Sequence, residues 1–210
     1  MTYEPGHNGP VRLGIAHHLG WAVAVTASDG HEVVDRRRIE LIEPGLPAAP
    51  IHHEGGPHLL HRRGKPLDDT ALAALVAEVR ASVVRTASAA LDELATALPE
   101  EIVSMSLRAW PADFPEDIAA QRRVPYEGRA DSVMYRQVLA ELGRVRGWQI
   151  HLYDARVVED DAARILGDRS DNVLRGPRAT LGPPWSRDHR IALAGTIVAT
   201  AGRRTAGADG

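Results

Sequence analysis

Cysteine is absent from the 210 residues of this chain, and lysine and aromatic side chains are scarce. Without cysteine, the protein has no disulfide framework, no thiolate metal ligand and no cysteine nucleophile. Lys65 is the single lysine, so arginine carries nearly all of the positive charge. An aromatic content of 4% offers little surface for stacking on nucleic-acid bases.

Several common classes of protein are excluded in the same way. The chain contains no Gly-x-x-x-x-Gly-Lys phosphate loop and no Gly-x-Ser-x-Gly nucleophile elbow. No apolar run approaches the length of a membrane span, and residues 1–10 lack the apolar core of a secretory signal. A formal net charge of -3 gives no argument from overall basicity for nucleic-acid binding. We therefore expect a cytoplasmic protein with no membrane partner, and the Arg, Ala and Gly bias indicates a bacterial genome of high GC content.

The remaining composition is that of a globular domain. A chain of this length with 44% hydrophobic and 25% charged residues can bury one substantial core. We expect a single domain over residues 11–202, with disordered tails at 1–10 and 203–210. Irregular insertions are predicted at about 43–67 and 111–129.

Residues 11–26 alternate between large and small side chains, and a period of two indicates β-strand. A tight turn in the middle divides the segment into strands over 11–17 and 20–27. After a turn signal, a third strand is predicted over 31–42. We expect this hairpin at the centre of a sheet, with Trp21 in the core.

Helical and strand patterns then alternate to the end of the chain. The predicted elements are a helix over 67–98, a strand over 101–109, a helix over 130–146, a strand over 148–153, a short helix over 157–167 and a last helix from Ser186. The resulting order, β-β-β-α-β-α-β-α, resembles that of ribonuclease-H-like proteins. We therefore predict an α/β fold of the ribonuclease-H-like type, with a mixed five-stranded sheet and helices on both faces.

Two segments carry a more specific resemblance. Residues 188–194, which begin Asp-His-Arg, resemble the opening of the last helix in Holliday-junction resolvases of the RuvC type, and residues 14–23 resemble their first hairpin. The resemblance implies carboxylates that hold two divalent metals for cleavage of a nucleic-acid phosphodiester. It also implies an aspartate on the first strand, where this chain has Ala16 followed by His17. Histidine brings no negative charge and suits zinc, manganese or iron better than magnesium.

The chain also resembles a family of uncharacterised bacterial proteins over most of its length. The shared elements are residues 17–23, Pro50-Ile51-His52, Ala130-Asp131 with Tyr135-Arg136, and Gly182-Pro183-Pro184-Trp185 with Asp188. This second resemblance implies a common site but no particular reaction.

The candidate site residues come from these segments. His17 and Asp188 are expected as metal ligands, Asp154 or Asp131 as a second carboxylate, and His52 as a loop-borne ligand or general acid/base. Most of these also have a purely structural alternative: a turn for His17 and His18, a solvated histidine-rich loop for His52, a helix cap for Asp131, and a favourable helix dipole for Asp188. His58 and His61 are expected to be solvated. We expect a hairpin histidine to approach Asp188, and His52 to fold over the same edge.

Two functions remain open at this point. The first is a metal-dependent phosphodiester hydrolase, such as a nuclease acting on nucleic acid, with Asp188, His52 and Asp131 in catalysis and Mg, Mn or Zn as cofactor. The second is a catalytically degenerate ribonuclease-H-like module that binds or regulates. Ala16 favours the second, whereas the convergence of separate polar motifs on one sheet edge favours the first.

Overall fold

The structure is a computed structural model that describes residues 9–55 and 65–206; His58 and His61 lie outside these ranges. The elements are β1 (Val11–His17), β2 (Trp21–Ser28), β3 (Val33–Glu40), η1 (Ile51–Gly55), α1 (Asp69–Ala97), β4 (Ile102–Arg108), α2 (Ile118–Gln121), α3 (Glu127–Val145), β5 (Gln149–Tyr153), α4 (Val158–Leu166), η2 (Gly167–Arg169), α5 (Ser170–Arg175), α6 (Pro177–Leu181) and α7 (Arg187–Ala206). The predicted order of the main strands and helices is confirmed.

The five strands form one mixed sheet in the order β3-β2-β1-β4-β5. β1 pairs with β2 and β2 with β3 in antiparallel fashion, whereas β1 pairs with β4 and β4 with β5 in parallel. The first hairpin is therefore central, as predicted. Because β1, β4 and β5 run in the same direction, their carboxyl ends meet at one edge of the sheet.

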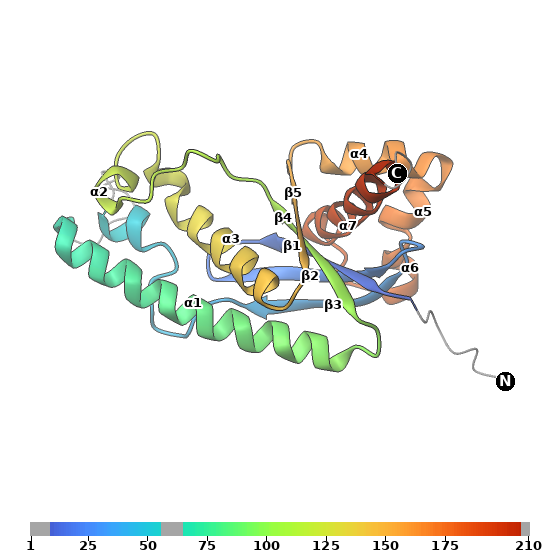
Figure 1. Ribbon diagram of the computed structural model, residues 1–210, viewed down its shortest axis with the longest axis horizontal. Helices are drawn as coiled ribbons and strands as arrows, with labels where there is room; N and C mark the ends of the chain where they lie inside the picture. The colour runs from blue at the N-terminus through green and yellow to red at the C-terminus, as the bar shows by residue number, and fades with distance from the viewer. Residues whose placement is uncertain (1–8, 56–64, 207–210) are drawn as a thin grey trace.

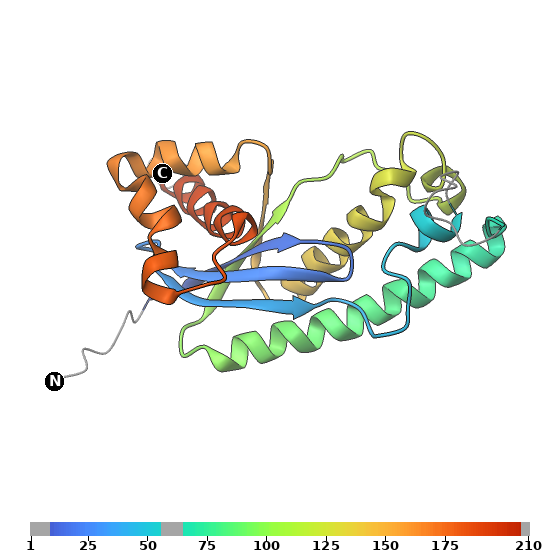
Figure 2. The ribbon, with the colours of Figure 1, turned by 180° about the vertical axis from the view of Figure 1, so that it is seen from behind.

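Helices cover both faces of the sheet (Figures 1 and 2). α1 and α3 pack on one face, and α7 and α4 lie on the other. One hydrophobic core lies on each face: the first includes Leu13, Leu91 and Leu139, and the second includes Val25, Leu193 and Ile197. The α/β fold class with helices on both faces is confirmed.

The large and small side chains of the hairpin are shared between these two cores. Ile15 of β1 faces α1 and α3, whereas Val23 and Val25 of β2 face α7. In the strand register Gly14 lies opposite Val25, and Ile15 lies opposite Ala24. Each pair thus joins a large side chain with a small one. The small residues of β1 leave room for α7 to lie close to the sheet.

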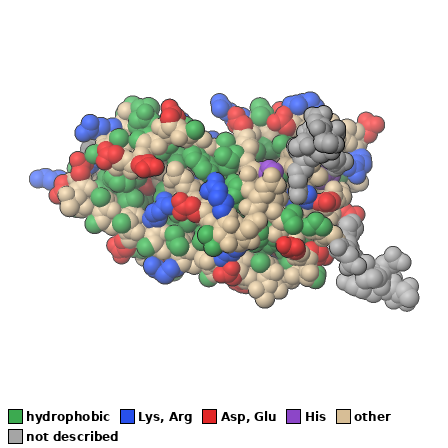
Figure 3. All heavy atoms as spheres, viewed as in Figure 1, with side chains coloured by type: hydrophobic (Ala, Val, Ile, Leu, Met, Phe, Trp, Pro, Cys, Tyr) green, Lys and Arg blue, Asp and Glu red, His purple; other side chains and the backbone are tan. Residues whose placement is uncertain are grey.

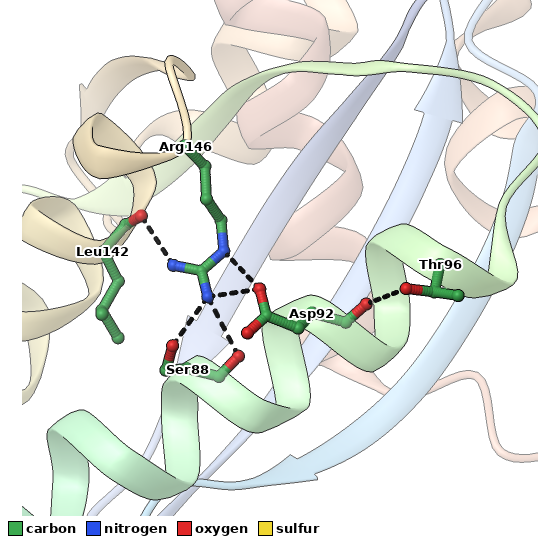
Figure 4. Close-up of polar contacts among 5 residues, drawn as sticks. All are labelled: Ser88, Asp92, Thr96, Leu142 and Arg146. Atoms are coloured by element: carbon green, nitrogen blue, oxygen red, sulfur yellow. Dashed lines mark hydrogen bonds and ion pairs between the residues drawn. The ribbon is translucent and has the colours of Figure 1, made fainter.

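Arg146, which follows α3, ties that helix to α1 (Figure 4). Its Nε and Nη2 donate to Asp92 Oδ1 at 3.0 and 2.6 Å. Nη2 also donates to Ser88 Oγ at 2.8 Å, and Nη1 donates to the Leu142 carbonyl at 2.9 Å. One guanidinium therefore fixes the relative position of the two helices that cover the first face.

The irregular stretches contain more structure than the sequence predicts. α3 begins at Glu127, before the predicted start at residue 130, and short helices occupy parts of the predicted loops. Asp117 caps α2 by accepting a hydrogen bond from the Ala120 N–H at 2.9 Å, and Pro177 begins α6. Such helices of four to six residues are too short for a hydrophobic period to reveal.

The prediction that Trp21 lies in the core is confirmed only in part. Trp21 is only partly buried, at the border of the α7-side core. It is the first residue of β2, where the sheet meets solvent.

The last helix, α7, continues to Ala206, within the segment that was predicted as a C-terminal tail. No described helix is long and apolar enough to span a membrane.

Candidate functional site

The candidate site lies where the β1–β2 turn meets the start of α7. His18 Nε2 lies 3.1 Å from Asp188 Oδ2 across this junction. A backbone hydrogen bond from the His18 N–H to the Trp21 carbonyl (2.8 Å) closes the turn, and Gly20 adopts a φ of +85° that other residues rarely reach. The hairpin and the last helix therefore meet as the element order predicts, through His18.

The turn presents a small surface, formed by His18, Trp21 and Arg38, which we call the hairpin surface. The imidazole of His18 stacks on the Trp21 ring with centroids 4.1 Å apart and planes 12° apart. The guanidinium of Arg38 lies over the same ring, 4.1 Å from its centroid. Stacking and cation–π contacts of this kind hold His18 in position beside Asp188.

The neighbours of Asp188 on α7 point elsewhere. His189 is buried, and its Nδ1 accepts a hydrogen bond from the Ser186 N–H at 3.2 Å. Burial and the nearby Arg36 lower the pKa of His189, so the ring accepts this bond as a neutral imidazole. Arg190 Nε donates to Glu159 at 2.9 Å. Of the three polar residues that open α7, Asp188 alone contacts the hairpin.

His17, the last residue of β1, lies on the α3 side of the sheet, opposite to the side on which α7 packs. Burial first, and then the charges of Arg136 and Arg108, lower the pKa of His17 to about 3. A hydrogen bond to the backbone of Ser132 acts in the opposite direction but does not compensate. His17 is therefore a neutral side chain at physiological pH, in a region of positive potential.

The low pKa of His17 has a measurable consequence. We expect its ring resonances in NMR spectra to titrate with a midpoint near pH 3. Because this folded-state pKa lies below the ordinary value of 6.5, the stability that His17 contributes is present above pH 6.5 and is lost as pH falls toward 3. His17→Gln assigns the resonance and should remove this part of the acid sensitivity. A midpoint near 6.5 would contradict the buried, cationic environment.

Asp131 lies inside α3 and binds a separate segment. Its two carboxylate oxygens accept hydrogen bonds from the backbone N–H groups of Ile51 (3.0 Å) and His52 (2.9 Å), at the start of η1. Burial raises the pKa of Asp131 to about 6 in spite of these two bonds. Asp131 therefore positions η1. This role differs from the two expected for it, a cap of its own helix and a metal ligand.

His52 is placed by this contact on the α1 and α3 side of the molecule. η1 packs against α1 and α3, and the His52 ring lies 5.4 Å from the ring of His53. No described contact joins His52 to Asp188. The structure thus groups His52 with Asp131, and His18 with Asp188.

Asp154 follows β5 at the edge where the parallel strands end. Its Oδ1 accepts the Arg156 backbone N–H at 2.9 Å and lies 3.3 Å from Arg156 Nε. These hydrogen bonds, with the charges of Arg156 and Arg108, lower the pKa of Asp154. Asp154 is exposed and faces arginine side chains.

These donors do not fit a two-metal centre. Among residues 9–55 and 65–206, no group of three His, Asp or Glu side chains lies close enough to hold a metal ion. Asp188 contacts His18, Asp131 binds backbone amides, and Asp154 binds Arg156. At the position where the resemblance implies a carboxylate, Ala16 is buried in the α7-side core. Two magnesium ions need several carboxylate oxygens, which this edge does not bring together.

Sequence reasoning missed two arginines beside this edge, Arg108 at the end of β4 and Arg136 on α3. Both lower the pKa of His17, and Arg136 is buried. In a chain whose positive charge is nearly all arginine, neither residue stands out in the sequence. The shared segment that includes Tyr135-Arg136 was the one signal that pointed to this position.

No family model and no curated protein matches the chain. Among solved structures, the chain is similar to T. thermophilus RuvC in complex with a Holliday junction substrate. The similarity covers 93% of this chain and 96% of that one, at 12% sequence identity and a TM-score of 0.50. At this identity the similarity concerns the fold and not the activity. The chain thus has the ribonuclease-H-like fold, in the form found in RuvC.

Proposed function

We propose that this protein binds nucleic acid at the edge where β1 meets α7, and that it does so without two-metal cleavage. The observation that carries the proposal is the contact between His18 and Asp188, 3.1 Å apart. This contact lies where β1 meets the start of α7, and the resemblance to RuvC-type resolvases implies a functional site in that region. RuvC itself was solved with a Holliday junction, which makes nucleic acid the first ligand to test.

The exposed arginine side chains at this edge support binding of nucleic acid. Arg38 and Arg108 are both exposed, and arginine is the residue best suited to phosphate contacts. The donor set, by contrast, lacks the carboxylates of a two-metal hydrolase. These features together favour the degenerate binding module over the metal-dependent hydrolase.

Fluorescence anisotropy with labelled single-stranded, duplex and four-way-junction DNA tests the proposal. We expect binding that weakens as salt is added, because phosphate contacts release counterions. The double variant His18→Ala/Arg38→Ala removes most of the hairpin surface and should weaken binding about tenfold, or about 1.4 kcal/mol. The control is Arg85→Ala on α1, since Arg85 and Arg38 are both exposed and each pairs with one glutamate. Absence of binding to all three DNAs would refute the proposal.

A metal-dependent hydrolase is the second candidate, and the His18–Asp188 pair is the observation that favours it. A carboxylate beside a histidine can hold a metal ion or support general-base chemistry. This candidate requires that magnesium or manganese raise the melting midpoint and that the protein cut one of the DNAs. Asp188→Asn would then abolish cutting.

We expect neither a metal-induced shift nor cutting. Asp188→Asn should melt close to the wild type and should bind DNA no more weakly, since a negative charge is removed. The matched control is Asp161→Asn, which removes the aspartate that pairs with Arg164 on α4. Manganese-dependent cleavage that is lost in Asp188→Asn and retained in Asp161→Asn would replace the binding proposal with the hydrolase.

A further inference from the structure

Arginine side chains from three parts of the chain gather around one cavity of about 630 Å³. Arg108 ends β4, Arg129 and Arg136 come from α3, and Arg156 follows β5. Asp154 is the single acidic residue among the described residues that line the cavity. On the face drawn in Figure 3, acidic and basic side chains are intermixed. In a chain of net charge -3, the lining of this cavity is a local concentration of positive charge.

Arg136 is the buried member of this group, with 5% of its surface exposed. Its Nε donates to the Ser132 carbonyl (2.8 Å), its Nη1 to the Ala109 carbonyl (2.6 Å) and its Nη2 to Ser132 Oγ (3.0 Å). All three acceptors are uncharged. Within residues 9–55 and 65–206, no carboxylate pairs with this guanidinium, although a buried charge is costly without a counter-ion.

The other arginines increase the positive charge around Arg136. Arg108 and Arg129 are exposed, and neither side chain hydrogen-bonds or forms an ion pair within the described part of the chain. Burial, followed by the charges of Arg108 and Arg129, lowers the pKa of Arg136 to about 10. Arg156 is exposed and lies 3.3 Å from Asp154. An anion in the cavity would therefore meet the guanidinium groups of Arg108 and Arg129, which have no hydrogen-bond or ion-pair partner within the described residues.

A structural role explains only part of this arrangement. Arg136 braces the first half of α3 against the end of β4 through Ala109, and that contact alone could justify its burial. It does not explain why three further arginines, from three separate segments, surround the same cavity. Like charges repel, so an anion bound among them would stabilise such a gathering.

We propose that this cavity is a phosphate-binding site. Guanidinium groups bind phosphate oxygens through paired N–H donors, and a cavity of this size accommodates a phosphate with an attached group. The phosphate comes either from a nucleic-acid strand or from a free phosphorylated small molecule. The inference does not rest on the proposed function, because inorganic phosphate alone tests it.

The first experiment is calorimetric titration of the full-length protein with inorganic phosphate at low salt. We expect one site, and at least tenfold weaker binding in Arg108→Ser/Arg156→Ser, which corresponds to about 1.4 kcal/mol. These exposed rim residues can be replaced without disturbing the brace that Arg136 forms. The matched control is Arg164→Ser/Arg175→Ser, because both arginines are exposed, lie outside the cavity and pair with a nearby aspartate.

Two further ligands identify the source of the phosphate. A nucleoside 5′-monophosphate carries a terminal phosphate, and a dinucleoside monophosphate carries a single phosphodiester. If the nucleoside monophosphate binds more tightly than the dinucleoside monophosphate, and Arg108→Ser/Arg156→Ser loses this binding, the site is assigned to a small phosphorylated ligand. If the dinucleoside monophosphate binds more tightly, the site is assigned to a nucleic-acid strand. The proposal is overturned if none of the three ligands binds, or if the rim and control variants bind equally well.

Discussion

Replacing Gly14 with alanine is expected to lower the free energy of unfolding by at least about 3 kcal/mol. Gly14 lies in the middle of β1, directly beneath α7. A Cβ atom at this position would lie 1.9 Å from the carbonyl oxygen of Ala192 and 3.1 Å from Thr196 Cγ2. Because the nearer atom belongs to the backbone, the clash can be relieved only if α7 moves away from the sheet.

Urea denaturation of Gly14→Ala measures this effect, with Gly9→Ala as the control. No atom lies within 4 Å of the Cβ position at Gly9, so that variant should resemble the wild type. A displaced α7 would also carry Asp188 away from His18, so any Gly14→Ala protein that folds should lose the contact between these two side chains. Stability within about 0.5 kcal/mol of the wild type would show that α7 does not pack against β1 in this way.

The second large effect is expected for Asp131→Ala, at about 2–4 kcal/mol of stability. Asp131 is buried, and its carboxylate accepts the backbone N–H groups of Ile51 and His52. Alanine leaves both donors without this acceptor in a part of the molecule where water cannot readily replace it. The variant should also expose η1 to proteolysis, since Asp131 positions that segment. A loss of stability below about 0.5 kcal/mol would contradict this role.

Asp131→Asn separates the hydrogen bonds from the charge. Asparagine keeps one acceptor oxygen, so it should cost less stability than alanine. In the wild type, burial raises the folded-state pKa of Asp131 to about 6, above its ordinary value of 3.8. The stability that protonation contributes is therefore fully present below pH 3.8 and is lost as pH rises through about 6. Asp131→Asn should lack this dependence when melting is followed across that range.

The sheet was predictable from the sequence because its signal is local. The alternation over residues 11–26 fixes which side chains of the hairpin face each core, and the connectivity follows from the order of periodic segments. The short helices could not be predicted, because four to six residues do not show a helical period. Trp21 follows the alternation of β2, but its burial depends on what lies beyond the strand end.

The site was predictable only in part. Element order brings the β1–β2 turn to the start of α7, and the structure places His18 beside Asp188. The partner of Asp131 is a backbone segment 80 residues earlier in the chain, for which no sequence pattern exists. Arg108, Arg136 and Arg156 are far apart in the sequence and ordinary in an arginine-rich chain. Only the fold shows that they surround one cavity.

Hydrogen–deuterium exchange of the protein with and without four-way-junction DNA tests the location of the binding site most directly. We expect the DNA to protect the β1–β2 turn at residues 17–21 and the start of α7 at residues 186–190. Residues 88–97, in the last part of α1 where Arg146 binds Ser88 and Asp92, should exchange equally in both states. Protection confined to that region, or no protection at saturating DNA, would contradict a nucleic-acid site at the junction of β1 and α7.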